Sequence, residues 1–222
     1  MEGRQKMKRY GVRMLAFLVI FVLTACGAEG SGPEQETEEK EEKMIDVTFA
    51  GGEAEAYRSY LEERESVGDL YFACLNLEGN DSAVLALTHE KHGVDVGEET
   101  ITANHLVLNN FIQGEVVQVA GSSMDTYSEN TVFSYGEGKL WVPVYGGISF
   151  YTVSGSRITG EVYVTEAGVS TKYSVTGKKR TEPETVPSET VSEMVKGKEQ
   201  TLPVRFYPNT EKNRDRVFAS EK

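Results

Sequence analysis

Few side chains in this chain combine the type and the spacing that metal binding requires. His89 and His92 flank Glu90 and Lys91 in the string HEKH, and the third histidine is His105. A helical zinc motif places two histidines four residues apart on one face, whereas these two are three apart in a stretch that reads as a strand end and a loop. We interpret them as surface-loop histidines, with a metal site as the alternative, and we predict no metal ligand and no cofactor.

A catalytic nucleophile is equally hard to find. The sequence contains no G-x-S-x-G elbow, no Walker loop and no pair of neighbouring cysteines. Cys74 lies in the apolar run LYFACLNL without a basic neighbourhood, which favours a small buried side chain over a nucleophile. Glutamates are so abundant that no carboxylate pair for glycoside hydrolysis stands out. We therefore predict no catalytic residue and a protein that is not an enzyme.

The beginning of the chain follows a secretory pattern that ends at Cys26. Basic residues precede an apolar run from Met14 to Leu23, and small residues follow the run. These ten residues are about half of what a helix needs to span a bilayer. We therefore expect a cleaved signal peptide rather than a permanent transmembrane anchor. Translation from Met1 or from Met7 would supply the same pattern.

The four residues Leu23-Thr24-Ala25-Cys26 resemble the lipobox of bacterial lipoproteins. That resemblance covers residues 1–27 and implies removal of residues 1–25 and a diacylglycerol on the thiol of Cys26. Each buried methylene contributes about 0.8 kcal/mol, and stable anchoring needs more than one acyl chain, which a diacylglyceryl group supplies. We expect a lipid anchor on the extracytoplasmic face of the cell membrane, with an ordinary secreted protein as the alternative.

An acidic segment separates this anchor from the rest of the chain. Residues 27–43 contain seven Glu and two Lys but no large apolar side chain. Such a segment cannot bury enough surface to offset the entropy of ordering, so we predict a disordered spacer over residues 26–43. A charged, solvated helix is the alternative for its Glu/Lys part.

The net charge excludes one class of partner. The whole chain carries −12, and removal of residues 1–25 leaves 18 Lys/Arg against 34 Asp/Glu, a net charge of −16. A surface of this charge is repelled by nucleic acid and by anionic lipid headgroups. We therefore predict no nucleic-acid partner, and membrane contact only through the lipid at Cys26.

The remaining residues, 44–222, are expected to form a single α+β domain. An amphipathic pattern predicts a short helix over 54–66, and apolar runs on both faces predict a hairpin of central strands at 70–77 and 83–88. Two helical patterns follow near the C-terminus, at 188–197 and from 209 onward. The other predicted strands are His105–Ile112, Glu115–Ala120, Thr131–Tyr135, Leu140–Tyr145, Ile148–Val153, Ile158–Val164, Thr171–Thr176 and Leu202–Phe206.

A rhythm of turns indicates how the strands are connected. Gly114, Gly136, Gly155 and Gly177 are spaced 22, 19 and 22 residues apart, each in or near a polar turn between β-branched or aromatic residues. This spacing favours a meander of hairpins. The predicted fold is therefore mainly an antiparallel β-meander with a short N-terminal helix and C-terminal helices.

The string LNLEGNDSAVLAL resembles the D-x-D-G-D-G-x-x-E-L loop of small surface lipoproteins of gut Firmicutes. The neighbouring strings YRSYLEERES, FSYGEGKL, YSVTGKK and RFYPNTEKNRDRVF extend the resemblance over most of 54–218. It implies a fold and a location rather than a reaction. The acidic positions of the loop fall on Asn76, Glu78 and Asn80, and Val84 stands where the closing glutamate would be. Because three formal charges are missing, we predict a β-turn without calcium.

Two aromatic residues are the candidate ligand-binding residues. Trp141 and Tyr145 alternate with aliphatic residues in LWVPVY and share one face of the predicted strand. Exposed aromatic side chains could stack on a sugar or grip a protein partner, whereas buried ones would fill a second packed layer. Packing is the favoured interpretation of the two.

Taken together, these patterns predict a membrane-anchored extracytoplasmic lipoprotein whose folded part is a non-catalytic binding or scaffold module. A cell-surface protein or a glycan is the expected partner. The alternative is a cell-envelope or polysaccharide hydrolase with an unrecognised carboxylate site. A two-lobed capture protein of a transporter is disfavoured because no alternation of strands and helices is visible.

Overall fold

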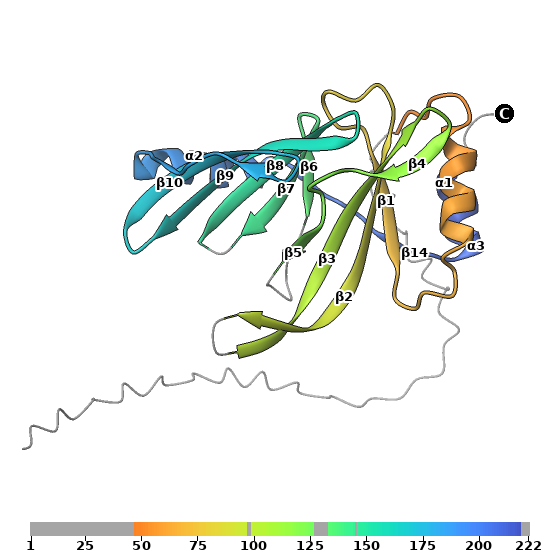
Figure 1. Cartoon of the computed structure of the whole chain (residues 1–222), viewed down its shortest axis with the longest axis horizontal. Helices are drawn as coiled ribbons and strands as arrows, with labels where there is room; N and C mark the ends of the chain where they lie inside the picture. The colour runs from red at the N-terminus through yellow and green to blue at the C-terminus, as the bar shows by residue number, and fades with distance from the viewer. Residues whose placement is uncertain (1–46, 97–98, 127–132, 145, 219–222) are drawn as a thin grey trace, which may run out of the picture. The chain divides into compact units, whose positions relative to one another are not determined.

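The computed structural model describes residues 47–96, 99–126, 133–144 and 146–218 (Figure 1). The described part of the chain consists of two antiparallel sheets and three helices, which confirms the α+β class and the predominance of antiparallel strands. The predicted signal peptide, the lipidated Cys26, the acidic spacer and Tyr145 lie outside the described residues. None of the helices in the described part has the length and the apolar content needed to span a bilayer.

Sheet A is a meander of consecutive hairpins to which a strand from near the end of the chain is added. Its order is β14-β1-β2-β3-β4, and β5 pairs with β3. β1 and β2 are central, as their two apolar faces predict. The bounds are Tyr71–Leu75 (β1), Val84–Val96 (β2), Glu99–Ile112 (β3), Glu115–Gln118 (β4), Met124–Thr126 (β5) and Tyr207–Pro208 (β14).

Sheet B is a second meander, with strand order β11-β10-β9-β8-β7-β6-β13, and β12 pairs with β10. The single meander expected from the turn spacing is therefore divided between two sheets. The bounds are Ser134–Gly136 (β6), Lys139–Val144 (β7), Gly147–Ser154 (β8), Arg157–Glu166 (β9), Val169–Thr176 (β10), Lys179–Arg180 (β11), Glu184–Thr185 (β12) and Leu202–Pro203 (β13).

The main hydrophobic core lies between the two sheets. Alternate side chains of each strand contribute to it, such as Ala73 and Leu75 in sheet A and Leu140 and Val142 in sheet B. Residues between these positions point to the opposite face of their sheet, because side chains alternate along a strand. The outer face of each sheet carries apolar side chains as well. Two helices cover this face of sheet A, and one helix covers that of sheet B.

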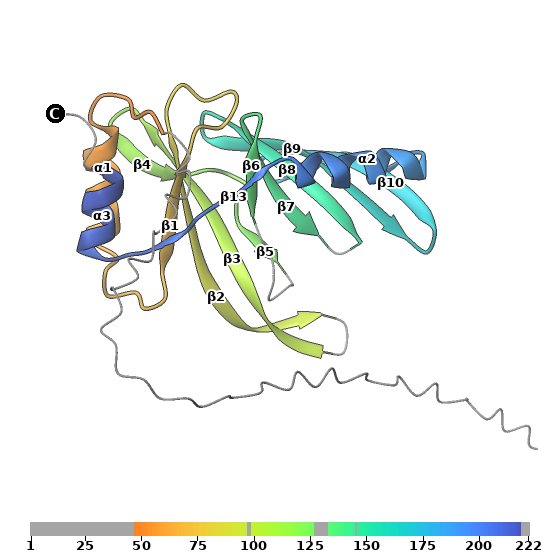
Figure 2. The same cartoon turned by 180° about the vertical axis from the view of Figure 1, so that it is seen from behind.

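Two helices cover the outer face of sheet A. α1 (Glu53–Glu62) and α3 (Glu211–Phe218) lie beside one another in Figures 1 and 2. Tyr57 and Leu61 of α1 are fully buried against this face, and the rings of Phe72 and Phe218 stack with centroids 5.8 Å apart. The hydroxyl of Tyr57 donates to the carbonyl of Ala83 at 2.8 Å. This bond satisfies a polar atom that burial would otherwise leave unpaired.

A third helix, α2 (Ser188–Glu199), covers the outer face of sheet B (Figure 2). Val191 and Met194 of α2 pack against Trp141, Ile148 and Tyr163. The described chain therefore has four layers: the helix pair, sheet A, sheet B and α2. Sheet A packs directly against sheet B, whereas the other two contacts between layers are between helices and a sheet.

Several predicted boundaries are wrong, and the longest error concerns the β2–β3 hairpin. β2 continues to Val96 and β3 begins at Glu99, with His89 opposite His105 in the register. The string HEKH therefore lies in a strand and not in a loop. Its mixture of charged and small residues resembles a loop because this part of the hairpin extends beyond the apolar core positions. β5, β11 and β12 were not expected either, since each has only two or three residues.

Residues 119–122, between β4 and β5, form a crossing segment that contacts sheet B before the chain returns to sheet A at β5. The Ala120 amide donates to the Ser156 carbonyl at 2.7 Å, and the Ile158 amide donates to the Ala120 carbonyl at 3.1 Å. Gly121 follows in the left-handed region, with a φ of +82°. This crossing fixes the start of β5 relative to the strands of sheet B.

Candidate functional site: a cavity between the two sheets

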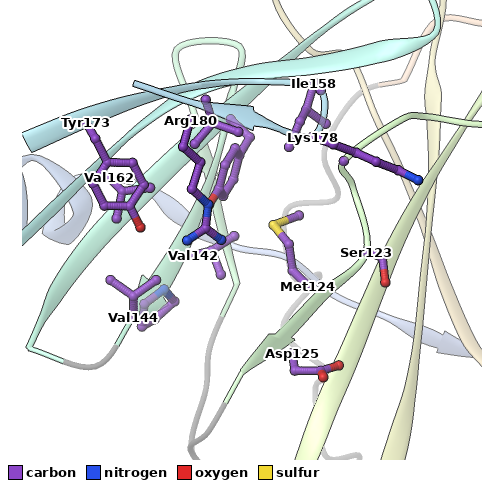
Figure 3. Close-up of a pocket in the computed structure, with 15 residues that line it drawn as sticks. Ser123, Met124, Asp125, Val142, Val144, Ile158, Val162, Tyr173, Lys178 and Arg180 are labelled. Carbon is purple, nitrogen blue, oxygen red and sulfur yellow. The ribbon is translucent and has the colours of Figure 1, made fainter. Parts of the chain in front are cut away.

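A cavity of about 560 Å³ lies between β5 with its preceding loop and the inner face of sheet B (Figure 3). Its volume is within the range of small-molecule sites, roughly 300–1,000 Å³. The wall from sheet B is built by β7, β8, β9, β10 and β11, and the opposite wall by the segment around β5. Its lining consists of Gly121, Ser123, Met124, Asp125, Val142, Pro143, Val144, Tyr151, Ile158, Val162, Tyr173, Val175, Gly177, Lys178 and Arg180.

The wall from sheet B is mostly aliphatic. Alternation places Val142 and Val144 of β7 on the same face, and Val162 of β9 and Val175 of β10 join them from neighbouring strands. Tyr151 and Tyr173 add hydroxyl groups to this wall, and burial raises the pKa of Tyr151, an effect that a hydrogen bond with Ser149 and the charge of Arg180 offset only in part. Tyr151 therefore stays protonated at neutral pH and can donate a hydrogen bond toward a ligand.

Two cations stand on the same side of the cavity. Arg180 belongs to β11, and Lys178 lies in the turn that precedes it. The Arg180 guanidinium is 5.5 Å from the centroid of the Tyr173 ring, a cation–π contact. In Figure 3 the Arg180 side chain runs across the sheet-B wall, whereas Lys178 projects toward the side of Ser123. The cavity thus combines an aliphatic surface with a group suited to an anion.

The opposite wall contains a chain of polar contacts centred on His105. Its Nδ1 contacts Asp125, the residue opposite it in the β3–β5 ladder, and its Nε2 is 3.3 Å from the hydroxyl of Ser123. The ring of His89 lies against that of His105, with centroids 5.1 Å apart. Ser123 and Asp125 line the cavity, so the three side chains that form this Ser–His–Asp series lie at the cavity edge. The same order of contacts activates serine nucleophiles in acyl-transfer enzymes.

Acyl transfer also requires N–H donors for the oxyanion. Two backbone amides near Ser123 are already engaged: the Ser122 amide donates to the Val119 carbonyl at 3.1 Å, and the Leu108 amide donates to the Ser122 hydroxyl at 3.1 Å. The contacts of Ser123, His105 and Asp125 therefore match the proton-transfer part of a hydrolase site. The amides of Ser122 and Leu108 are instead engaged in hydrogen bonds within the fold.

The two candidate ligand-binding residues are not brought to this cavity. Trp141 is only 5 % exposed and packs under α2, with its ring centroid 5.2 Å from that of Phe150. The structure therefore places Trp141 in a core rather than on an open surface. Tyr145 lies outside the described residues.

The loop after β1 is tied to both sheets by its polar side chains. The Asn80 amide group donates to the Ser82 carbonyl at 2.7 Å and to the Asn110 side chain at 3.0 Å. Asn110 in turn donates to Asn80 at 2.8 Å and to the Gly155 carbonyl at 2.9 Å, across to sheet B. Within the described residues, no group of three or more His, Cys, Asp and Glu side chains could hold a metal ion. The metal-free turn stays a prediction.

The cavity residues were missed by the sequence reasoning for an identifiable reason. Arg180 and Lys178 belong to the string TGKKR, which reads as a turn, and the shortness of β11 hides its pairing with β10. The sequence feature that could have indicated this site is the run of three consecutive cations, Lys178, Lys179 and Arg180, in an otherwise acidic chain. His105, Ser123 and Asp125 are far apart in the sequence, and only the β3–β5 pairing brings them together.

Comparisons of this chain with protein-family models, with curated proteins and with solved structures find no match.

Proposed function

We propose that the chain is a bacterial lipoprotein that is anchored through lipid at Cys26 on the extracytoplasmic face of the cell membrane and whose folded part binds a small molecule without transforming it. The lipobox-like string at residues 23–26 supports the anchor, and the acidic residues that follow it support a spacer. The observation that carries the binding role is the cavity of about 560 Å³ between the sheets.

The cavity changes the expected partner. Stacking of a cell-surface protein or a glycan on Trp141 was the alternative to packing, and the indole is buried under α2. The space between the sheets is instead a concave surface that combines aliphatic side chains with polar and charged groups, a combination found in small-molecule sites. A ligand held there would replace water along the partly exposed Met124 and Val144, and that removal of apolar surface from water favours binding.

The cavity role is tested with 1-anilinonaphthalene-8-sulfonate, an apolar anion whose fluorescence rises in apolar sites. We expect saturable binding to the native chain. Val144→Trp places an indole inside the cavity and should weaken this binding at least about tenfold, because the ligand would have to displace the ring. The control is Val169→Trp, the same change at a residue that is 52 % exposed and lies outside the cavity lining. Equal binding to both variants would contradict the cavity role.

A hydrolase is the second candidate function, and the Ser123–His105–Asp125 contacts favour it specifically. Its nucleophile would be a serine and not the carboxylate expected for the alternative above. A fluorophosphonate probe distinguishes the two functions because it labels serines that a histidine activates. A binding module predicts no labelling of the native chain. Labelling that disappears in Ser123→Ala and in His105→Gln would favour the hydrolase instead.

A further inference from the structure

The charged groups that line the cavity give it a positive bias in an acidic protein. Among the described residues they are Asp125, Lys178 and Arg180. The carboxylate of Asp125 is engaged by His105 on the wall around β5. The two cations lie on the opposite side, in and next to β11, while the chain after residue 25 carries a net charge of −16. A cationic site on such a surface attracts an anion to this cavity in preference to the rest of the domain.

Arg180 is the cation that is placed to hold an anion. Its guanidinium contacts the Tyr173 ring, and no carboxylate in the described part of the chain forms an ion pair with it. The planar guanidinium offers parallel N–H donors that match the two oxygens of a carboxylate. The Tyr173 ring lies beside the guanidinium and limits its orientations, so less side-chain entropy is lost on binding.

The rest of the wall determines what the anion is attached to. Val142, Ile158, Val162 and Val175 are buried beneath the cavity, and the partly exposed aliphatic side chains of its lining are Met124, Pro143 and Val144. A polyol or a sugar would leave its hydroxyls unpaired against this surface, and each unpaired buried polar group is costly. An aliphatic body loses no hydrogen bond there and gains from leaving water.

From these observations we infer that the ligand is an aliphatic monocarboxylate, with its carboxylate on Arg180 and its hydrocarbon chain along the sheet-B wall. The inference rests on the proposed function, because it names the ligand class of the same cavity. Lys178, two residues before Arg180, adds to the positive potential but projects toward Ser123 (Figure 3). Arg180 is therefore the specificity-determining residue, and Lys178 contributes mainly to attraction.

The test measures the affinity of decanoate and of decan-1-ol for the folded chain by isothermal titration calorimetry. Decanoate should bind, and decan-1-ol should bind at least about tenfold more weakly, because only the acid can form charge-assisted hydrogen bonds with Arg180. Arg180→Gln should lower decanoate affinity at least about tenfold, and Arg180→Lys should lower it less because the charge remains. Lys179→Gln is the matched control: it removes one positive charge from the adjacent residue, which does not line the cavity, and should change affinity less than about twofold.

The outcomes separate the ligand class from the binding role. If the acid and the alcohol bind equally and Arg180→Gln has no effect, while Val144→Trp still blocks binding, the cavity is a ligand site but the carboxylate is not its ligand class. If neither decanoate nor anilinonaphthalene sulfonate binds the native chain, the proposed function itself fails. An equal loss in Arg180→Gln and Lys179→Gln would show a general charge effect and would overturn the role of Arg180.

Discussion

Gly121→Ala is expected to destabilise the folded domain by about 2–4 kcal/mol. Its φ of +82° is disfavoured for any residue with a Cβ, which costs about 1 kcal/mol. An added Cβ would also lie 2.0 Å from the carbonyl oxygen of Gly177. That oxygen belongs to the backbone, so relief requires a shift of the chain, and overpacking of this kind costs about 1–3 kcal/mol. Urea denaturation of the two proteins measures the difference.

Gly114→Ala is the matched control for this effect. Gly114 has a φ of +90° in the β3–β4 turn, but no heavy atom lies within 4 Å of the position of an added Cβ. The stability lost on Gly114→Ala should therefore come from the backbone conformation alone, about 1 kcal/mol. Equal losses at the two glycines would contradict the close approach of the 119–122 crossing to Gly177, and with it the wall of the cavity at that point.

Cys26→Ser is expected to move the protein from the membrane to the aqueous phase. The thiol is the lipid acceptor in the lipobox pattern, and a serine hydroxyl does not replace it in that modification. The apolar run before it has ten residues, about half of what a spanning helix needs, so we do not expect this run to replace the lipid as an anchor. Detergent phase partitioning of the full chain produced in a bacterial host measures the change.

Cys74→Ala provides the control for the loss of a thiol. Cys74 is a free cysteine of sheet A that is buried against the helix pair, so it is not accessible to lipid. Its variant should stay in the membrane fraction like the native chain. A Cys26→Ser protein that also stays there would mean that the apolar run itself, and not the lipid, holds the protein at the membrane.

The layers of the fold could be predicted only where the pattern is local. β1 and β2 were identified as central strands because their residues are apolar on both faces, and the structure confirms that one face meets sheet B and the other meets the helices. The alternation around Trp141 was also correct, since Leu140 and Val142 face the main core and Trp141 faces away. Sequence could not show that α2 covers the aromatic face, because that depends on a helix about 50 residues later in the chain.

The cavity could not be predicted for a related reason. Its walls come from two sheets, and no local pattern states which strands of one sheet will face which residues of the other. Arg180 lies in a strand of two residues, below the length at which alternation is visible. The contacts of His105 with Asp125 and Ser123 depend on the pairing of β3 with β5, and β5 has only three residues.

The mass of the N-terminal peptide of the mature protein, isolated from bacterial membranes, tests the central claim most directly. The claim is that the domain acts at the membrane surface while attached through Cys26. It predicts a chain that begins at Cys26, lacks residues 1–25 and carries the added mass of a diacylglycerol on this cysteine. An unmodified Cys26, or a mature chain that begins at another residue, would contradict the lipid anchor and leave the cavity as the property of a protein held in place by some other means.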